Sequence, residues 1–253
     1  MRKIFCLCII VLFITACKNN GNDKVDRTIK IDRNQNKTQI DTIPKVIKIS
    51  KKNESAIFRG TNANKATNKE FNTLAIKLNN KAIELYSYVG GEPVSNRDSL
   101  LLDSALVLLN KAIKIDTHYY LAYANKAMIL SKLKKYTEAI KTLNNIERVY
   151  PNFAEGFAGQ GFFYEKTGHY DKAAGKYQEA IEAYLMRLNK SYNIIERVNI
   201  QVDIAFMLLF TEGKDRALQL IDTIVARNPD NIMAKYMKES ISVFNREEFI
   251  SNF

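Results

Sequence analysis

The sequence is poor in the residues that most often carry chemistry. Among 253 residues there is no tryptophan, and there are only two histidines and three cysteines. The cysteines are Cys6, Cys8 and Cys17, so the rest of the chain has no disulfide, no thiolate nucleophile and no cysteine ligand for a metal. His118 and His169 lack a second histidine at the spacing of a metal site. We therefore predict neither a catalytic cysteine nor a metal centre.

Motifs that bind phosphates or activate a nucleophile are also missing. Gly156, Gly159 and Gly161 have the spacing of part of a nucleotide-binding loop, but they lie within a helical pattern with no strand before them. The sequence contains no Walker loop and no Gly-x-Ser-x-Gly elbow. We predict a protein that is not an enzyme and that uses no cofactor.

The excess of positive over negative charge is large, and most of it lies in one segment. The formal net charge is +11, and residues 18–65 hold 12 Lys or Arg against 5 Asp or Glu. Residues 66–253 hold 24 against 22 and are nearly neutral. A basic tail of low hydrophobicity is typical of a solvated, disordered linker. We therefore predict no nucleic-acid partner.

A single pattern of residue sizes occurs twice in succession between residues 120 and 185. Small residues at Ala127 and Gly161 would let crossing helices approach closely, Gly168 favours a helix end, and Pro151 stops a helix. Matching positions, which are separated by one constant offset, are Tyr136 and Tyr170, Ala139 and Ala173, and Leu143 and Tyr177.

The two copies contain Tyr123-x-x-Lys126-Ala127-x-x-Leu130 and Phe157-x-x-Gln160-Gly161-x-x-Tyr164. They resemble the tetratricopeptide repeat, a helix–turn–helix unit of about 34 residues. Weaker copies precede and follow, so the resemblance extends over about residues 66–250. It implies an all-α solenoid: a right-handed superhelix of about four helix pairs, ending in a C-terminal capping helix that opens at Asp230 and Asn231. It also implies protein or peptide binding in a concave groove.

The resemblance assigns the groove to one side of the first helix of each pair. Phenylalanine mixed with lysine there suits an amphipathic peptide or helix. As an alternative, Phe206 and Phe210 pack as core against the terminal helix. The candidate groove residues are Asn125, Met128, Lys132, Glu155, Phe162, Lys166, Asp203 and Phe206.

The N-terminus has the pattern of an export signal. Arg2 and Lys3 precede an apolar run of about a dozen residues, too short to span a bilayer as a helix. The run ends in Ile14-Thr15-Ala16-Cys17, which resembles the bacterial lipobox. That resemblance implies a signal peptide at 1–16, lipidation of Cys17 and a flexible linker over 17–65. An ordinary secretory signal is the alternative.

These observations predict a lipid-anchored protein of the bacterial cell envelope. Lys18 follows the cysteine in place of an aspartate, which favours the outer membrane. Its repeats would bind a partner protein and serve as a scaffold or assembly factor. The alternative is a binding module for a non-protein envelope ligand, such as peptidoglycan or a glycan, with no catalysis.

Overall fold

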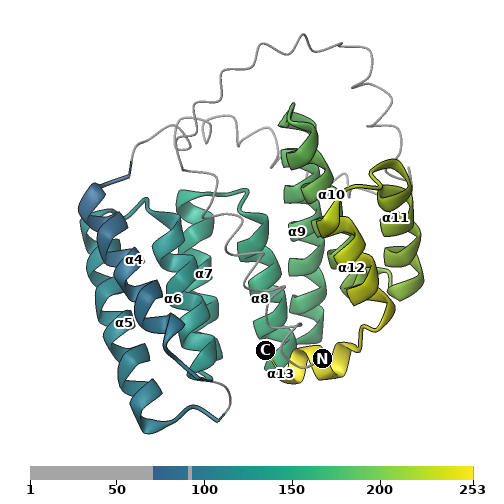
Figure 1. Ribbon diagram of the computed structural model, residues 1–253. Helices are drawn as coiled ribbons and strands as arrows, with labels where there is room; N and C mark the ends of the chain where they lie inside the picture. The colour runs from purple at the N-terminus through teal and green to yellow at the C-terminus, as the bar shows by residue number, and fades with distance from the viewer. Residues whose placement is uncertain (1–70, 91–92, 253) are drawn as a thin grey trace. The chain divides into compact units, whose positions relative to one another are not determined.

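The computed structural model describes residues 71–90 and 93–252, and these residues form ten helices and no strand (Figure 1). The predicted signal peptide 1–16, the lipidated Cys17 and the linker 17–65 lie outside the described residues. The helices are α4 (Thr73–Ser87), α5 (Asn96–Ile115), α6 (Tyr120–Lys132), α7 (Tyr136–Val149), α8 (Ala154–Lys166), α9 (Tyr170–Lys190), α10 (Ile194–Thr211), α11 (Lys214–Arg227), α12 (Ile232–Ser242) and α13 (Arg246–Asn252).

The described residues fall into two compact units. One contains residues 71–180 together with 247–252, and we call it the α4–α8 unit. The other contains residues 181–246, and we call it the α10–α12 unit. The helices follow one another in pairs, α4 with α5, α6 with α7, α8 with α9, and α10 with α11. The prediction of an all-α fold with about four helix pairs is confirmed for the described part of the chain.

Small residues form the contact faces of the α4–α8 unit, as the repeat predicts. Ala82 of α4, Ala105 of α5, Ala127 of α6 and Ala139 of α7 are all completely buried. Gly161 of α8 is packed so closely that a Cβ atom there would lie only 2.5 Å from Cδ1 of Tyr177 on α9. Side chains of this size let helix backbones approach, so larger residues from the partner helix fill the remaining space.

Polar side chains cap the first two helices that the structure describes. The side chain of Asn72 precedes α4 and accepts hydrogen bonds from the backbone N–H groups of residues 74 and 75. The Ser95 hydroxyl caps α5 by accepting from the backbone N–H of Asp98. Asp171 lies in the first turn of α9, where a negative charge complements the helix dipole.

The turns between paired helices share one backbone geometry. Gly168 has φ of 78°, and the N–H of His169 donates to the carbonyl of Tyr164 at 2.8 Å. The same turn occurs one repeat earlier, where Lys134 has φ of 60° and the N–H of Lys135 donates to the carbonyl of Leu130 at 2.8 Å. Lys134 thus occupies a left-handed position that glycine fills at lower cost.

A polar side-chain pair ties one helix pair to the next in the α4–α8 unit. Asn125 of α6 donates to Asn79 of α4 at 2.7 Å, and both amides are buried. A buried amide pair is satisfied only in one register, so it fixes how the first helices of two pairs lie against each other.

The core of the α10–α12 unit is built largely from α10. Phe206 and Phe210 of this helix pack edge-to-face at 5.5 Å, and Phe244 lies 6.4 Å and 5.4 Å from them. The helix predicted to open at Asn231 is α12, capped by the Asn231 side chain. It is not the last helix, because α13 follows it after a short connection.

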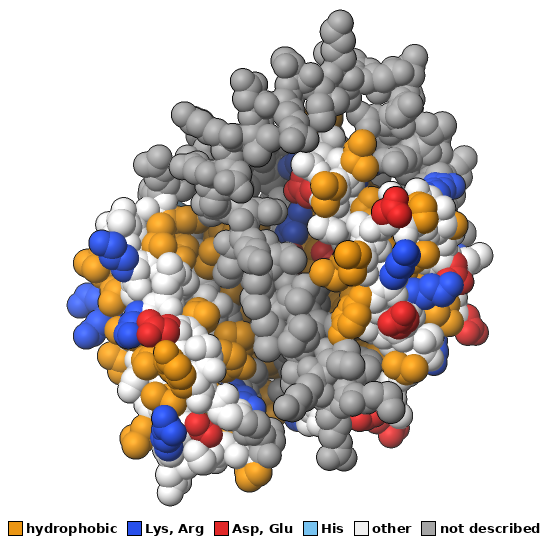
Figure 2. Space-filling model, in the orientation of Figure 1, with side chains coloured by type: hydrophobic (Ala, Val, Ile, Leu, Met, Phe, Trp, Pro, Cys, Tyr) orange, Lys and Arg blue, Asp and Glu red, His pale blue; other side chains and the backbone are white. Residues whose placement is uncertain are grey.

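Charges are mixed on the face of the described residues that is seen in Figure 2. Figure 2 shows Lys and Arg side chains interspersed with Asp and Glu on both units, without a large area of one sign. None of the helices that the structure describes combines the length and apolar character needed to cross a membrane. Among the described residues there is also no group of three or more His, Cys, Asp or Glu side chains that could hold a metal ion.

Candidate protein-binding surface

The predicted groove residues belong to both units, so we consider each unit by itself. In the α4–α8 unit they lie on α6 and α8. Asn125 is a buried packing residue, bonded to Asn79, and Glu155 is also buried. Met128 and Lys132 are half-buried and present part of their surface to solvent. Of the candidates on α6, these two are the ones a partner could reach.

In the α10–α12 unit the predicted groove residues are Asp203 and Phe206. Asp203 is half-buried, whereas Phe206 is only 3% exposed. Phe206 packs on Phe210 and on Phe244, so the alternative in which these rings form core is the correct one. The helical period predicted a groove position for Phe206, but its ring is covered by Phe244, which follows α12.

The remaining candidates, Phe162 and Lys166 of α8, lie against the C-terminal helix. The Phe249 ring of α13 meets the Phe162 ring edge-on at a centroid distance of 5.3 Å. The Lys166 ammonium group donates to the backbone carbonyls of Ile250 at 2.8 Å and Ser251 at 2.6 Å. The prediction that Phe162 is open to a partner is therefore wrong for this conformation, in which Phe162 is 2% exposed.

Phe162 packs against the second helix of its own pair, α9. Tyr177 of α9 packs against Phe162 at 5.5 Å, and its hydroxyl donates to the Glu165 carboxylate at 2.7 Å. The Tyr177 ring fits only because Gly161 has no side chain. The small residue of the repeat thus makes room for the Tyr177 ring, on which Phe162 packs.

Lys166 is positioned by an aromatic residue of α7. Its ammonium group lies 5.9 Å from the centre of the Tyr136 ring, which is within the range of a cation–π contact. The Tyr136 ring also lies 6.3 Å from Phe163 of α8. The Lys166 ammonium group therefore interacts with both the Tyr136 ring and the carbonyl groups of α13.

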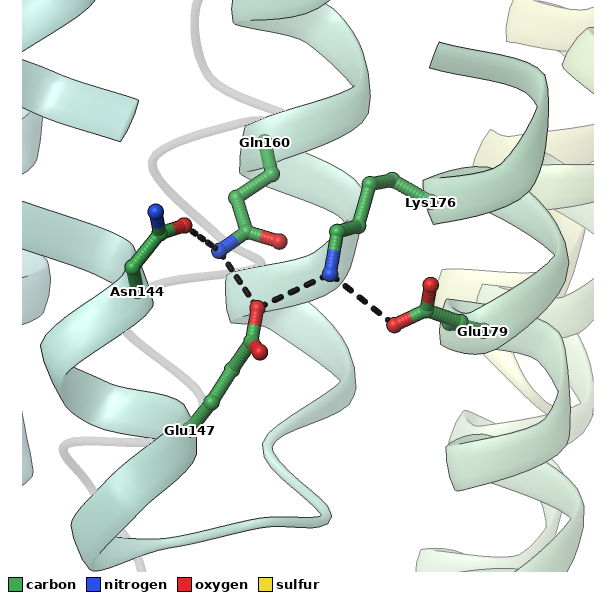
Figure 3. Close-up of polar contacts among 5 residues, drawn as sticks. All are labelled: Asn144, Glu147, Gln160, Lys176 and Glu179. Carbon is green, nitrogen blue, oxygen red and sulfur yellow. Dashed lines mark hydrogen bonds and ion pairs between the residues drawn. The ribbon is translucent and has the colours of Figure 1, made fainter. Parts of the chain in front are cut away.

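A second polar cluster joins α7, α8 and α9 (Figure 3). Gln160 is completely buried, and its amide nitrogen donates to Asn144 at 2.8 Å and to Glu147 at 2.7 Å. Lys176 donates to Glu147 at 2.9 Å and to Glu179 at 3.0 Å. This network gives the polar Gln160 of the second repeat its partners.

Electrostatics in this cluster favour the charged form of Lys176. Partial burial works against the charge, but hydrogen bonds to Glu147 and Glu179 prevail and raise the pKa of Lys176 above its ordinary value. The ammonium group also lies 5.0 Å from the Phe157 ring centre. Because both carboxylates are paired to the lysine, this cluster resembles a structural contact between the three helices more than an acid–base site.

Comparisons with known proteins give only distant matches. No family model matches the sequence. Heat shock protein STI1 of Saccharomyces cerevisiae is 28% identical over 81 residues, which is 32% of this chain and 14% of that protein. The chain therefore matches about a seventh of the length of that relative.

Three crystal structures overlap with much of the chain at low similarity. MamA has a TM-score of 0.39 and 15% identity, over 79% of this chain and 97% of its own. A thermophilic TPR protein of Thermus thermophilus has a TM-score of 0.38 and 15% identity, over 67% of this chain and all of its own (100%). YrrB, a TPR protein with an unusual peptide-binding site, has a TM-score of 0.35 and 19% identity, over 73% of this chain and 98% of its own.

The helix pairs and their small contact residues themselves define the class. The described residues form an all-helical protein of successive helix pairs, with a turn geometry that recurs from one repeat to the next, which is the fold that the resemblance to the tetratricopeptide repeat predicts. Repeats of this kind present an extended surface made of many helices, which suits them to act as scaffolds for protein–protein interaction.

Proposed function

We propose that this protein is a membrane-anchored scaffold of the bacterial cell envelope, which binds a partner protein on its helical repeats and helps to assemble or localise a complex. The observation that carries the proposal is the docking of a helix on α8 through Phe162 and Lys166. A face that accepts a helical segment from its own chain has the chemistry to accept one from a partner.

The proposed attachment to the membrane rests on the sequence. The lipobox-like residues before Cys17 support lipidation of that cysteine, and several acyl chains give stable anchoring where a single chain is marginal. The 48 residues from 18 to 65 are polar and basic. As a flexible chain they would span roughly 40 Å, which would hold the repeats away from the bilayer.

Anchoring is tested by fractionation. Cells producing the full-length protein are labelled with a palmitate analogue and separated into soluble, inner-membrane and outer-membrane fractions. We expect label on the protein in the outer-membrane fraction, and loss of label and of membrane retention in Cys17→Ala. Membrane retention of Cys17→Ala would contradict a lipid anchor at this residue.

Partner binding is tested by crosslinking in intact cells, followed by affinity purification from membranes. We expect a stoichiometric protein partner. Its recovery should fall several-fold when Met128 and Lys132 are both changed to alanine, because these groove positions are the accessible ones on α6. Lys141→Ala, at an exposed position on α7, is the matched control and should leave recovery unchanged.

Two outcomes would contradict a protein scaffold. One is equal recovery of all partners with the groove variant and the control. The other is sedimentation of the purified protein with cell-wall material, unaffected by the groove changes and with no protein partner, which would favour the alternative of a glycan- or peptidoglycan-binding module.

A further inference from the structure

The C-terminal helix is too short to be stable without docking. α13 has seven residues, and isolated helices need roughly 12–15 residues to be even marginal in water. Its buried residue is Phe249, while the residues on either side are exposed or half-buried. The helical state of α13 therefore depends on what Phe249 and the helix end contact.

The contacts of α13 provide what a bound helix requires: burial of an apolar side chain and hydrogen bonds for the carbonyl groups at its end. Phe249 removes its ring from water by packing on Phe162, which supplies the apolar part of the interaction. Lys166 binds the carbonyls of Ile250 and Ser251, which belong to the last turn of α13, where carbonyl groups have no partner within the helix. A cation at this end also complements the helix dipole.

Both residues that receive α13 lie at positions where the repeat pattern places a bound peptide. From these contacts we propose that the surface formed by Phe162, Lys166 and Tyr136 is a peptide-binding site, and that α13 is its resident ligand in the free protein. The site selects a short helix with an aromatic side chain next to its terminal carbonyl groups. A partner protein presents such a helix and binds here by displacing α13. This inference rests on the proposed scaffold function and names the segment that regulates it.

The covalent connection makes occupancy by α13 favourable even though the contact is small. Lys166 and Ile250 lie 84 residues apart in one chain, so the contact of α13 is intramolecular and competes with a free peptide through an effective concentration. An intrinsically weak helix therefore fills the site in most molecules, and the apparent affinity of any competing peptide falls in proportion to the fraction of sites left free. A variant that frees the site should bind a competing peptide about tenfold or more tightly than the unaltered chain does.

The experiment uses the full-length chain and a fluorescent peptide with the sequence of residues 245–253. Binding is measured by fluorescence anisotropy to the unaltered chain, to Phe249→Ala, and to Phe249→Ala combined with Lys166→Met. We expect Phe249→Ala to bind the peptide at least about tenfold more tightly than the unaltered chain, and Lys166→Met to reverse most of that gain. A peptide with alanine in place of Phe249 should not bind.

Glu247→Ala is the matched control, because this residue is on α13 and exposed, and it should leave peptide binding as weak as in the unaltered chain. Circular dichroism verifies that the variants remain helical, and hydrogen exchange of residues 247–252 provides a second readout. We expect these amides to exchange faster in Lys166→Met, and slower exchange or no change would contradict the docking.

Equal peptide binding by the unaltered chain and Phe249→Ala, or no binding by either, would overturn the proposal. A dimer of the unaltered chain that becomes monomeric in Phe249→Ala would assign α13 to the site of a second copy and would also overturn it. These measurements use purified protein and peptide, so they are independent of whether an envelope partner is found.

Discussion

Replacement of Gly161 by alanine tests how the second repeat is packed. A Cβ atom at this position would lie 2.5 Å from Cδ1 and still closer to Cε1 of Tyr177. The ring has little room to retreat, because it is completely buried, packs on Phe162 at 5.5 Å, and is held by its hydroxyl on Glu165 at 2.7 Å. Something in this contact has to move.

The cost follows from three contributions. Overpacking a filled core costs about 1–3 kcal/mol. Displacing the ring also weakens a hydrogen bond to a carboxylate, which contributes about 1.5–3 kcal/mol. Alanine offsets about 1 kcal/mol of this because it favours helix over glycine. We expect Gly161→Ala to lower the free energy of unfolding by about 2–4 kcal/mol, measured by urea denaturation followed by circular dichroism.

Gly175 on the next helix is the matched control. A Cβ atom there meets nothing within 4 Å, so Gly175→Ala should stabilise the protein by about 1 kcal/mol. The two substitutions are chemically identical and should have opposite signs. A Gly161→Ala protein as stable as the unaltered chain would refute the packing argument.

A second change should rescue the first. In the preceding repeat the corresponding positions hold Ala127 and Leu143, both buried. Gly161→Ala combined with Tyr177→Leu recreates that pair, so the double variant should be more stable than the sum of the single effects by about 1–3 kcal/mol. Additive effects would show that the two positions do not share one space.

Three further predictions concern single contacts. Lys134→Gly should stabilise the chain by about 0.5–1 kcal/mol in the same denaturation assay, because Lys134 has φ of 60°, and a destabilised variant would contradict this. Asn125→Leu should cost about 1–3 kcal/mol by leaving the buried side-chain oxygen of Asn79 without its donor, whereas changing both to leucine should cost much less; equal losses would argue against the pair. Lys176→Met should cost about 1–2 kcal/mol at neutral pH by removing the charged hydrogen bond to Glu147. Because folding raises the pKa of Lys176, its contribution is complete below 10.5 and declines as pH rises through the folded value, so the gap between the Lys176→Met and unaltered stability curves should close at alkaline pH.

The sequence by itself determined the helical character and the pairing. Three features of the sequence predicted the paired helices that the structure describes. They are the helical spacing of large residues, the small residues such as Ala139 and Ala173, and the constant offset between the two copies. Gly168 predicted the turn where φ is positive. These features are local, or repeat at a fixed interval, so the sequence pattern reveals them without knowledge of distant contacts.

Only the tertiary structure decided which of the predicted groove residues are covered. The repeat pattern predicts Phe162 and Lys166 as groove residues, but α13, which covers them, lies 84 residues along the chain from Lys166. The periodicity of the sequence predicts on which side of a helix a residue lies, but it does not predict which distant segment packs against that side. The same reason explains Phe206, whose ring is covered by Phe244, and Gln160, whose polar partners lie on another helix. Contacts between distant segments depend on packing of the whole fold, and no local pattern encodes them.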